Sequence, residues 1–546
     1  METEIQLQFQ TNVQKTMKLR YLKYSIYVLC ALIMIACTKD KGNYDYQDIN
    51  SVEINGIEDH YLIEFGSTPN ISPTLEFSKD PNFNEENYSF EWISFNQGEV
   101  HLSTARKLLH TGKDFDIPLA LSLGKYTLYY RVKEKSTGIL WTRKFEIEVT
   151  GSIKGGWAVL SEVDNNSQLD YFEYDLETNS HPKEYRDFAS YFIDSETGAQ
   201  LTLEGKPKFI EGWVNTTAAT GTNRYLLYVG TDKKTEKINV TAGFQWSERF
   251  NFSFETLNNM ELPRLDRIYP IAASQGYGMY NGVLHKRVNV SNINFGNPAN
   301  LLNGELVELA PFIAVNRMQI TGNVALVYDK KNKRFLRCTA TNTALTGSLS
   351  MTGAAFNPNN VGMDLVWMGS TNINNGSAYA VLTKDGKFHL ARMTNNITTF
   401  EAKYLDDISS LPGIAQAKHF EVDQIYGYLQ YAVGGKLYQY DVDTKETKLM
   451  KDFGNREITM LKHNKGNYVS YTTAINPAQA DKAGRRFLPV IKAIIVATYD
   501  PTNPKTSGQV DFFEAPQFNM EYTTYYSFSG LGKVQDVACI EFPTGY

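Results

Sequence analysis

The chain has 546 residues, a length that predicts two to four domains or one large repetitive domain. Its 42% hydrophobic and 21% charged residues exclude an intrinsically disordered protein, and four cysteines in so long a chain argue against a disulfide scaffold. The formal net charge of −6 comes without a long basic run, which argues against a nucleic-acid partner. Aromatic residues reach 13%, with 34 tyrosines, and this excess favours strands over helices.

The first informative segment runs from Met17 to Cys37. Its basic residues Lys18, Arg20 and Lys23 precede a mostly apolar stretch over residues 25–36. This arrangement is typical of a secretory signal, and the stretch is too short to cross a bilayer of roughly 30 Å as a helix. The alternative interpretation is a buried apolar element with an incidental cysteine.

The apolar stretch ends in Met34-Ile35-Ala36-Cys37, which resembles a bacterial lipobox with Met34 in place of the usual leucine. The resemblance implies cleavage before Cys37 and acylation of that cysteine, so that lipid chains alone attach the protein to a membrane. We therefore expect residues 1–36 to be an over-called start plus a signal peptide, with Met17 as the true initiator. Residues 37–52 would be a lipidated linker.

Lys39 and Asp40 follow the predicted lipidation site directly. They are a partial match to the surface-export signal of Bacteroidetes lipoproteins, which normally contains more acidic residues. The resemblance implies an outer-membrane lipoprotein on the cell surface.

Residues 53–152 contain short runs that alternate apolar and polar side chains. The clearest runs are residues 88–94, 124–132 and 145–150, with a turn at residues 135–138. Period-two alternation is typical of half-buried strands, and about a hundred residues of this kind predict an Ig-like β-sandwich.

The second and third of these runs resemble the last strands of PKD domains. The PKD hallmark Trp-Asp-Phe-Gly-Asp-Gly is absent, and the chain reads Glu-Trp-Ile-Ser-Phe-Asn around Trp92. Together with the lipobox and the segment Lys41–Tyr46, the first 150 residues resemble the PKD-like family of Bacteroidetes lipoproteins. The resemblance implies an accessory role beside an outer-membrane transporter and its lid lipoprotein, as in starch-utilisation-type systems.

Residues 153–546 repeat one pattern, in which an apolar strand, a polar turn and a second strand follow one another about every 50 residues. Two of the turns carry the hairpin signals Asn281-Gly282 and Asp385-Gly386. The seven predicted hairpins begin at Trp157, Tyr225, Tyr277, Val324, Tyr379, Tyr428 and Ile494. Because each hairpin needs further strands to complete a small sheet, the pattern predicts a β-propeller of about seven blades. The alternative is a second and a third β-sandwich. The expected fold class is thus all-β, an N-terminal Ig/PKD-like sandwich followed by a propeller.

Motifs that would indicate an enzyme do not occur in the sequence. The eight histidines show no metal-ligand spacing, and no nucleophile elbow, Walker loop or dinucleotide-binding loop is present. A string from Asp80 to Glu91 places oxygen ligands at calcium-loop positions, but Glu85 stands where that loop needs glycine. We therefore predict no catalytic residue, no cofactor and no metal, with ligand-binding residues unassigned.

Two further features of the sequence need no functional interpretation. The basic run Lys330–Arg334 is expected to be a solvated hairpin tip. After loss of the signal peptide and lipidation of Cys37, Cys338 and Cys539 would be the remaining thiols, and the sequence leaves open whether they pair.

Three functions are compatible with these patterns. The leading hypothesis is a non-enzymatic, surface-exposed lipoprotein that captures or helps to import a glycan or peptide with a TonB-dependent transporter and its lid lipoprotein. The alternatives are a propeller glycosidase or lyase, and a structural or adhesive lipoprotein that binds another protein. Cys37, as the lipidation site, is the one functional residue that the sequence assigns.

Overall fold

A computed structural model gives the structure of the chain. It describes residues 17–18, 20–23, 25, 49–95, 106–119, 121, 123–151, 155–174, 180–192, 194, 199–216, 223–240, 244–248, 251–256, 262–272, 275–288, 295–296, 298–315, 324–339, 344–371, 373, 376–396, 398–463, 493–514 and 516–540. Within these ranges no helix has both the length and the apolar character that a membrane span requires.

The N-terminal domain is the predicted Ig/PKD-like β domain. Its five-stranded sheet has the order β2 (His60–Glu64), β7 (Leu140–Thr150), β6 (Gly124–Glu134), β4 (Tyr88–Phe95) and β5 (Arg106–His110). The strands β1 (Val52–Asn55) and β3 (Thr74–Phe77) form a two-stranded sheet. The three strands predicted from alternation correspond to β4, β6 and β7.

The core of the five-stranded sheet is built around Trp92, whose side chain is completely buried. The centre of its ring lies 4.4 Å from that of Tyr130 and 5.3 Å from that of Phe115. The indole N–H donates a hydrogen bond of 2.9 Å to the carbonyl of Gly112. The aromatic residues of the alternating runs therefore pack inward, as a half-buried sheet requires.

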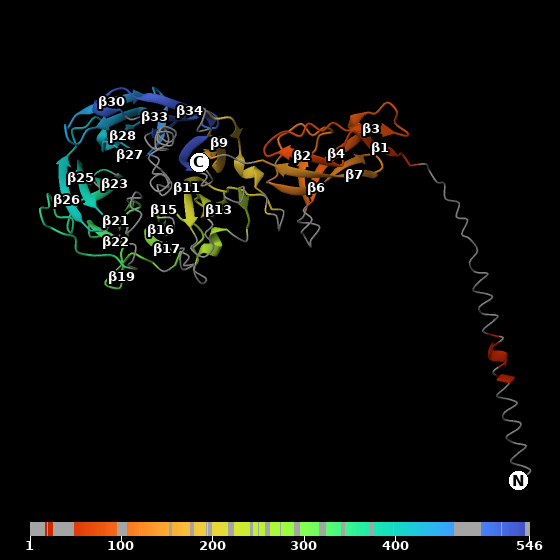
Figure 1. Ribbon diagram of the computed structural model, residues 1–546, viewed down its shortest axis with the longest axis horizontal. Coiled ribbons are helices and arrows are strands. Elements are labelled where there is room, and N and C mark those ends of the chain that lie inside the picture. The colour runs from red at the N-terminus through yellow and green to blue at the C-terminus, as the bar shows by residue number, and fades with distance from the viewer. Residues whose placement is uncertain are drawn as a thin grey trace, which may run out of the picture. The chain divides into compact units, whose positions relative to one another are not determined.

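Seven sheets of three or four strands follow one another around a ring and form the propeller (Figure 1). Blades 1 to 3 consist of β11 (Pro207–Thr216), β12 (Asn223–Thr231), β13 (Thr235–Asn239) and β14 (Gln245–Trp246); β15 (Arg267–Ala272), β16 (Gln275–Tyr280) and β17 (Val283–Val288); and β20 (Ala314–Val315), β21 (Val324–Asp329) and β22 (Arg334–Thr339). Blades 4 and 5 consist of β23 (Asp364–Thr371), β24 (Ser377–Lys384), β25 (Lys387–Asn395) and β26 (Phe400–Asp407); and β27 (His419–Val422), β28 (Leu429–Val433), β29 (Lys436–Tyr440) and β30 (Thr447–Asp452). Blade 6 consists of β31 (Glu457–His463), β32 (Ala493–Tyr499), β33 (Gly508–Glu514) and β34 (Thr523–Leu531).

Blade 7 combines both ends of the propeller sequence. It contains β35 (Lys533–Ile540), β8 (Gly156–Val163), β9 (Asn166–Glu173) and β10 (Glu184–Tyr185). The short elements outside the seven blades are β18 (Leu301–Leu302), β19 (Glu305–Leu306) and the 3-10 turns η1 (Glu85–Asn87), η2 (Phe188–Tyr191), η3 (Phe252–Glu255), η6 (Ile414–Gln416) and η7 (Gln517–Asn519).

Each of the seven predicted hairpins forms the second and third strands of one blade. The turn between β24 and β25 illustrates why the prediction succeeds. Asp385 and Gly386 have φ angles of 51° and 77°, the left-handed values that a two-residue hairpin turn needs. The hairpin signals therefore determine local structure directly. The seven sheets in which these hairpins lie confirm the predicted propeller.

The ring closes where the C-terminal strand β35 pairs antiparallel with β8, with Cys539 opposite Trp157. Trp157 belongs to an apolar cluster shared with blade 6, in which its ring centre lies 4.6 Å from that of Phe512. Its indole N–H donates a hydrogen bond of 2.9 Å to the hydroxyl of Tyr526. Strands from opposite ends of the domain thus share one sheet and one core.

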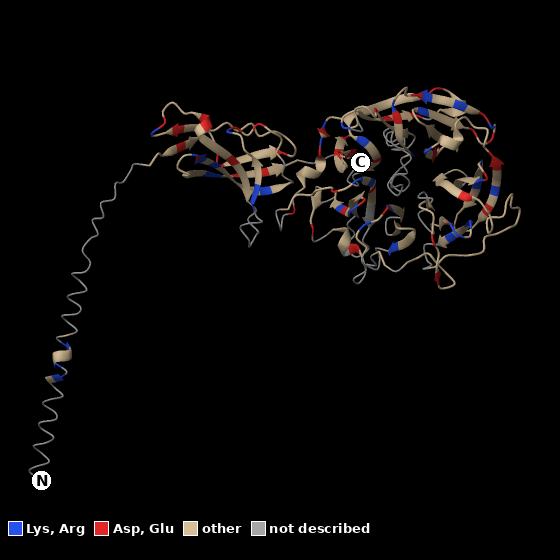
Figure 2. Ribbon diagram, turned by 180° about the vertical axis from the view of Figure 1, so that it is seen from behind, with Lys and Arg blue, Asp and Glu red and all other residues tan. Residues whose placement is uncertain are grey.

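Lys/Arg and Asp/Glu alternate around the blades and along the N-terminal strands, as Figure 2 shows. This mixture of signs matches the small formal net charge of −6.

Replacing Trp157 with alanine should lower the free energy of unfolding by about 3–5 kcal/mol, because it leaves a cavity at the ring closure. Replacing Tyr526 with phenylalanine removes only the hydrogen bond and should cost about 1 kcal/mol. Urea unfolding monitored by far-UV circular dichroism measures both effects, because this signal does not depend on the tryptophan that is replaced. Equal unfolding midpoints for Trp157→Ala and wild type would contradict a role for this contact in closure.

Candidate functional site

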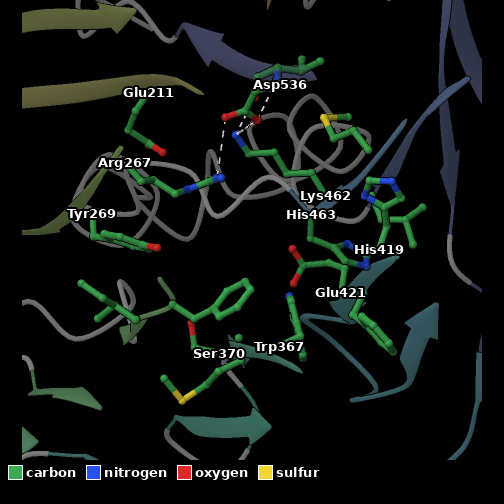
Figure 3. Close-up of a pocket in the computed structure, with 18 of the residues that line it drawn as sticks. Glu211, Arg267, Tyr269, Trp367, Ser370, His419, Glu421, Lys462, His463 and Asp536 are labelled. Carbon is green, nitrogen blue, oxygen red and sulfur yellow. Dashed lines mark hydrogen bonds and ion pairs between the residues drawn. The ribbon is translucent and has the colours of Figure 1, made fainter. Parts of the chain in front are cut away.

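A cavity of about 400 Å³ lies on the axis of the propeller (Figure 3). Residues from the innermost strand of every blade line it. These strands are β11, β15, β20, β23, β27, β31 and β35. The cavity therefore exists only in the closed ring, and its lining comes from seven separate parts of the sequence.

Several innermost strands change register against the second strand of their blade. The shifts fall between Pro207 and Phe209, Pro270 and Ala272, Leu365 and Trp367, Ile458 and Met460, and Val534 and Asp536. Such bulges interrupt the alternation of side chains and redirect the residues beside them. Trp367 and Asp536 directly follow their shifts, and both line the cavity.

Asp536 lies at the centre of the ionic contacts in the cavity wall and is only 2% exposed. Its Oδ1 accepts hydrogen bonds from Lys462 Nζ at 2.8 Å and from the backbone N–H of Val537 at 2.9 Å. Its Oδ2 accepts a hydrogen bond of 3.1 Å from the backbone N–H of Ile210 and lies 3.6 Å from a guanidinium nitrogen of Arg267. One carboxylate on blade 7 thus connects to blades 1, 2 and 6.

The pKa of Asp536 reflects two opposing influences. Burial raises the pKa. The positive charges of Lys462 and Arg267, together with the hydrogen bonds that Lys462 and the Ile210 N–H donate, outweigh burial and hold the pKa below its usual value. The carboxylate therefore stays ionised at neutral pH and is unsuited to act as a general acid.

Arg267 differs from Lys462 in how much of it faces the cavity. Its side chain is 39% exposed, whereas that of Lys462 is 16% exposed. Burial lowers the pKa of Arg267, but the charges of Asp536, Tyr269 and two nearby glutamates raise it above its ordinary value. Its guanidinium also lies 6.0 Å from the centre of the Tyr269 ring.

The guanidinium N–H groups of Arg267 make no hydrogen bond with any of the described residues. The contact with Asp536 is an ion pair at 3.6 Å, longer than a hydrogen bond of 2.7–3.2 Å. Figure 3 shows Arg267 reaching into the open space of the cavity.

Two further carboxylates, Glu211 and Glu421, line the same cavity and are 8% and 7% exposed. Glu421 Oε1 accepts a hydrogen bond of 2.9 Å from the backbone N–H of Val422. The close-up shows the side chain of Glu421 pointing into the cavity from β27 (Figure 3).

Trp367 provides an aromatic wall on β23. A Cβ atom on Gly369 would lie 2.4 Å from the indole ring, so that a glycine is needed there to let the ring lie against the strand. The ring centre of Phe420 lies 6.1 Å away at an interplanar angle of 30°. The indole N–H of Trp367 has no acceptor among the described residues.

Two histidines, His419 and His463, line the cavity. Burial, together with the positive charges of Lys418 and Lys533, lowers the pKa of His419 to about 4, so the imidazole is uncharged at neutral pH. His463 is completely buried, and its Nε2 lies 3.0 Å from Gln430 Oε1.

The predicted lipidation site, Cys37, lies outside the described residues, as do Lys39 and Asp40. Neither Cys338 nor Cys539 forms a disulfide bond. Cys338 is buried in β22, where its sulfur accepts a hydrogen bond of 3.1 Å from the Tyr277 hydroxyl, and Cys539 lies in the cavity wall on β35. The possible pairing of these cysteines is therefore not realised.

Two other features of the sequence have plain structural roles. Glu91, the last residue of the calcium-like string, lies in β4 and forms an ion pair of 3.0 Å with Arg131. The basic run Lys330–Arg334 forms the tip of the β21–β22 hairpin, as predicted, and its charges pair with Glu308, Asp329 and Asp364. In the part of the chain that the structure describes, no cluster of three or more His, Cys, Asp or Glu residues has a metal-binding arrangement.

Sequence reasoning missed the cavity residues because no motif connects them. Glu211, Arg267, Glu421, Lys462 and Asp536 come from five blades and have no fixed spacing. The one available signal is a charged residue in the strand that precedes a predicted hairpin, which applies to Glu211, Arg267, Glu421 and Lys462.

Comparison with known proteins supports the N-terminal assignment. The PKD-like family model matches residues 37–207, which confirms the resemblance for that part of the chain. No curated protein is detectably similar to this chain.

Several solved structures have similar strand arrangements. A quinonprotein alcohol dehydrogenase-like protein from Bacteroides thetaiotaomicron is 13% identical, with coverage of 89% of this chain and 96% of that chain and a TM-score of 0.42. A DUF4784 family protein from Bacteroides caccae is 9% identical, with 90% and 98% covered and a TM-score of 0.27. The β-propeller domain of Cps50 from Myceliophteria thermophila is 11% identical, with 48% and 70% covered and a TM-score of 0.27. These scores lie below 0.5, and the similarities carry no argument about function.

Replacing Lys462 with methionine should lower the free energy of unfolding by about 3–5 kcal/mol, because the buried carboxylate of Asp536 then loses its hydrogen-bonded cation. Since the pKa of Asp536 is lowered in the folded state, its carboxylate stabilises the fold above about pH 4 and loses that contribution as the pH falls through the lowered pKa. Urea unfolding at a series of pH values from 7 to 3 should show a smaller acid-induced loss for Asp536→Asn than for wild type. Identical pH dependence in the two proteins would contradict this role of Asp536.

Proposed function

We propose that this protein is a lipid-anchored, surface-exposed outer-membrane protein that binds a glycan or peptide in the propeller cavity without chemically changing it. In this proposal it delivers the cargo to a TonB-dependent transporter and its lid lipoprotein. The N-terminal β domain then serves as a spacer or docking module.

The observation that carries the binding role is the cavity itself. Its volume of about 400 Å³ falls within the range of small-molecule sites, roughly 300–1,000 Å³. Its lining combines aromatic side chains such as Trp367 and Tyr269 with a small number of ionised groups. This combination is typical of sites that orient a polar ligand through a few directed contacts.

The anchoring role is supported by two features of the N-terminal part. The chain carries the lipobox-like run that ends in Cys37, and the PKD-like match begins at that same residue. An acylated cysteine with two or more chains gives a stable attachment to a membrane.

Replacing Cys37 with alanine should move the protein from the membrane fraction to the soluble fraction, because it removes the acyl acceptor. Cell fractionation followed by immunoblotting measures the distribution in a Bacteroidetes host. Cys338→Ala, which changes a buried thiol outside the N-terminal segment, serves as the matched control and should stay in the membrane fraction. A Cys37→Ala protein that remains membrane-bound would refute the lipid anchor.

A pull-down of the native lipoprotein from its outer membrane in mild detergent should recover a transporter and a lid lipoprotein in stoichiometric amounts. Mass spectrometry identifies the partners, and their cargo narrows the ligand. Recovery of the protein alone would argue against the import role. Recovery of an unrelated adhesin or surface protein would favour the structural or adhesive alternative.

An enzymatic role is the second candidate, since Glu211 and Glu421 line the same cavity as Tyr269 and His419. Two carboxylates at a suitable separation support glycoside hydrolysis, and an uncharged histidine can accept a proton. Turnover of a polysaccharide panel that is lost in Glu421→Gln would establish an enzyme. Binding without turnover supports the non-enzymatic proposal.

A further inference from the structure

We infer that Arg267 is the anchor for a carboxylate on the cargo, and that the ligand of the cavity is an acidic sugar of the uronate type. This inference rests on the proposed binding function and gives the cargo a chemical class.

The first argument is the state of the Arg267 side chain. It is held from one side by the ion pair with Asp536, and 39% of it remains exposed toward the cavity. Asp536 accepts hydrogen bonds from Lys462 and two backbone N–H groups, and at 3.6 Å it accepts none from the guanidinium of Arg267. A planar guanidinium with unused donors matches the two oxygens of a carboxylate.

The second argument is that other donors face the same space from different blades. The indole N–H of Trp367 on β23 has no acceptor among the described residues, and Figure 3 shows Trp367 across the cavity from Asp536. His419 on β27 is uncharged at neutral pH, and its ring nitrogens make no hydrogen bond to another described residue. The lining thus calls for a ligand with oxygen acceptors on several edges.

A uronate meets this requirement better than a peptide does. Its carboxylate, ring oxygen and hydroxyl oxygens present acceptors all around one ring, and its hydroxyl hydrogens suit acceptors such as Glu421. A peptide C-terminus presents one carboxylate, and each residue before it adds one N–H donor for every carbonyl acceptor. A cavity of about 400 Å³ has the size of a small oligosaccharide site.

The test is isothermal titration calorimetry of the mature chain with disaccharides of galacturonate, glucuronate and mannuronate, each beside its methyl ester. We expect at least one free acid to bind and its methyl ester to bind about tenfold more weakly or worse, since esterification removes the charge that Arg267 recognises. Arg267→Gln should weaken binding of the free acid by a similar factor and leave the weak binding of the ester unchanged.

The matched control is Arg143→Gln in the N-terminal domain. Arg143 is also 39% exposed and also pairs with an aspartate, Asp59, but it lies outside the cavity. This variant should bind the uronate like wild type. Circular dichroism and the urea midpoint establish that Arg267→Gln is folded, and Arg267→Lys, which keeps the charge without the planar fork, should restore only part of the affinity.

The outcomes separate the two proposals. Equal binding of acid and ester, unchanged binding in Arg267→Gln, or binding of neutral sugars or dipeptides in place of uronates would overturn the uronate inference and leave cargo capture intact. Binding of no sugar or dipeptide at all would overturn both. Recovery of the transporter in the pull-down is independent of Arg267 and tests the import role alone.

Discussion

The pairing of β35 with β8 is the constraint on which the rest of the propeller depends. It places the last described strand at the inner edge of a blade whose other strands come from the start of the domain. Asp536 lies on that closing strand, and its contacts reach Ile210 of blade 1, Arg267 of blade 2 and Lys462 of blade 6. Backbone pairing and one carboxylate therefore fix the same closure, and without it the cavity would lack the part of its wall that β35 supplies.

The ionic contacts of the cavity wall have a cost that the fold must offset. Buried charges are stabilising only when they are paired and hydrogen-bonded, and Asp536 fulfils this with two side-chain cations and two backbone N–H groups. Arg267 is less well compensated by contacts within the protein. Its one ion pair is long, and the described residues accept no hydrogen bond from its guanidinium. A group left in this condition inside a formed cavity is what a ligand site requires, since the ligand then supplies the missing partner.

The N-terminal domain and the propeller contribute different parts of the proposed function. The first follows from a family resemblance that the match over residues 37–207 supports, together with the lipobox-like run that ends in Cys37. The second follows from the geometry of the cavity alone, because the similar solved structures carry no argument about ligands.

The sequence by itself determined the all-β class, the N-terminal β domain and the seven hairpins. These features follow from local rules, namely period-two alternation and turn residues such as Asp385-Gly386 that adopt left-handed φ angles. The tertiary structure alone decided the innermost strands and the cavity. Several of those strands carry bulges that break the alternation, and Glu211, Arg267, Glu421 and Asp536 come together only when seven blades close into a ring. Local periodicity specifies a blade, whereas the spatial meeting of distant strands specifies the site.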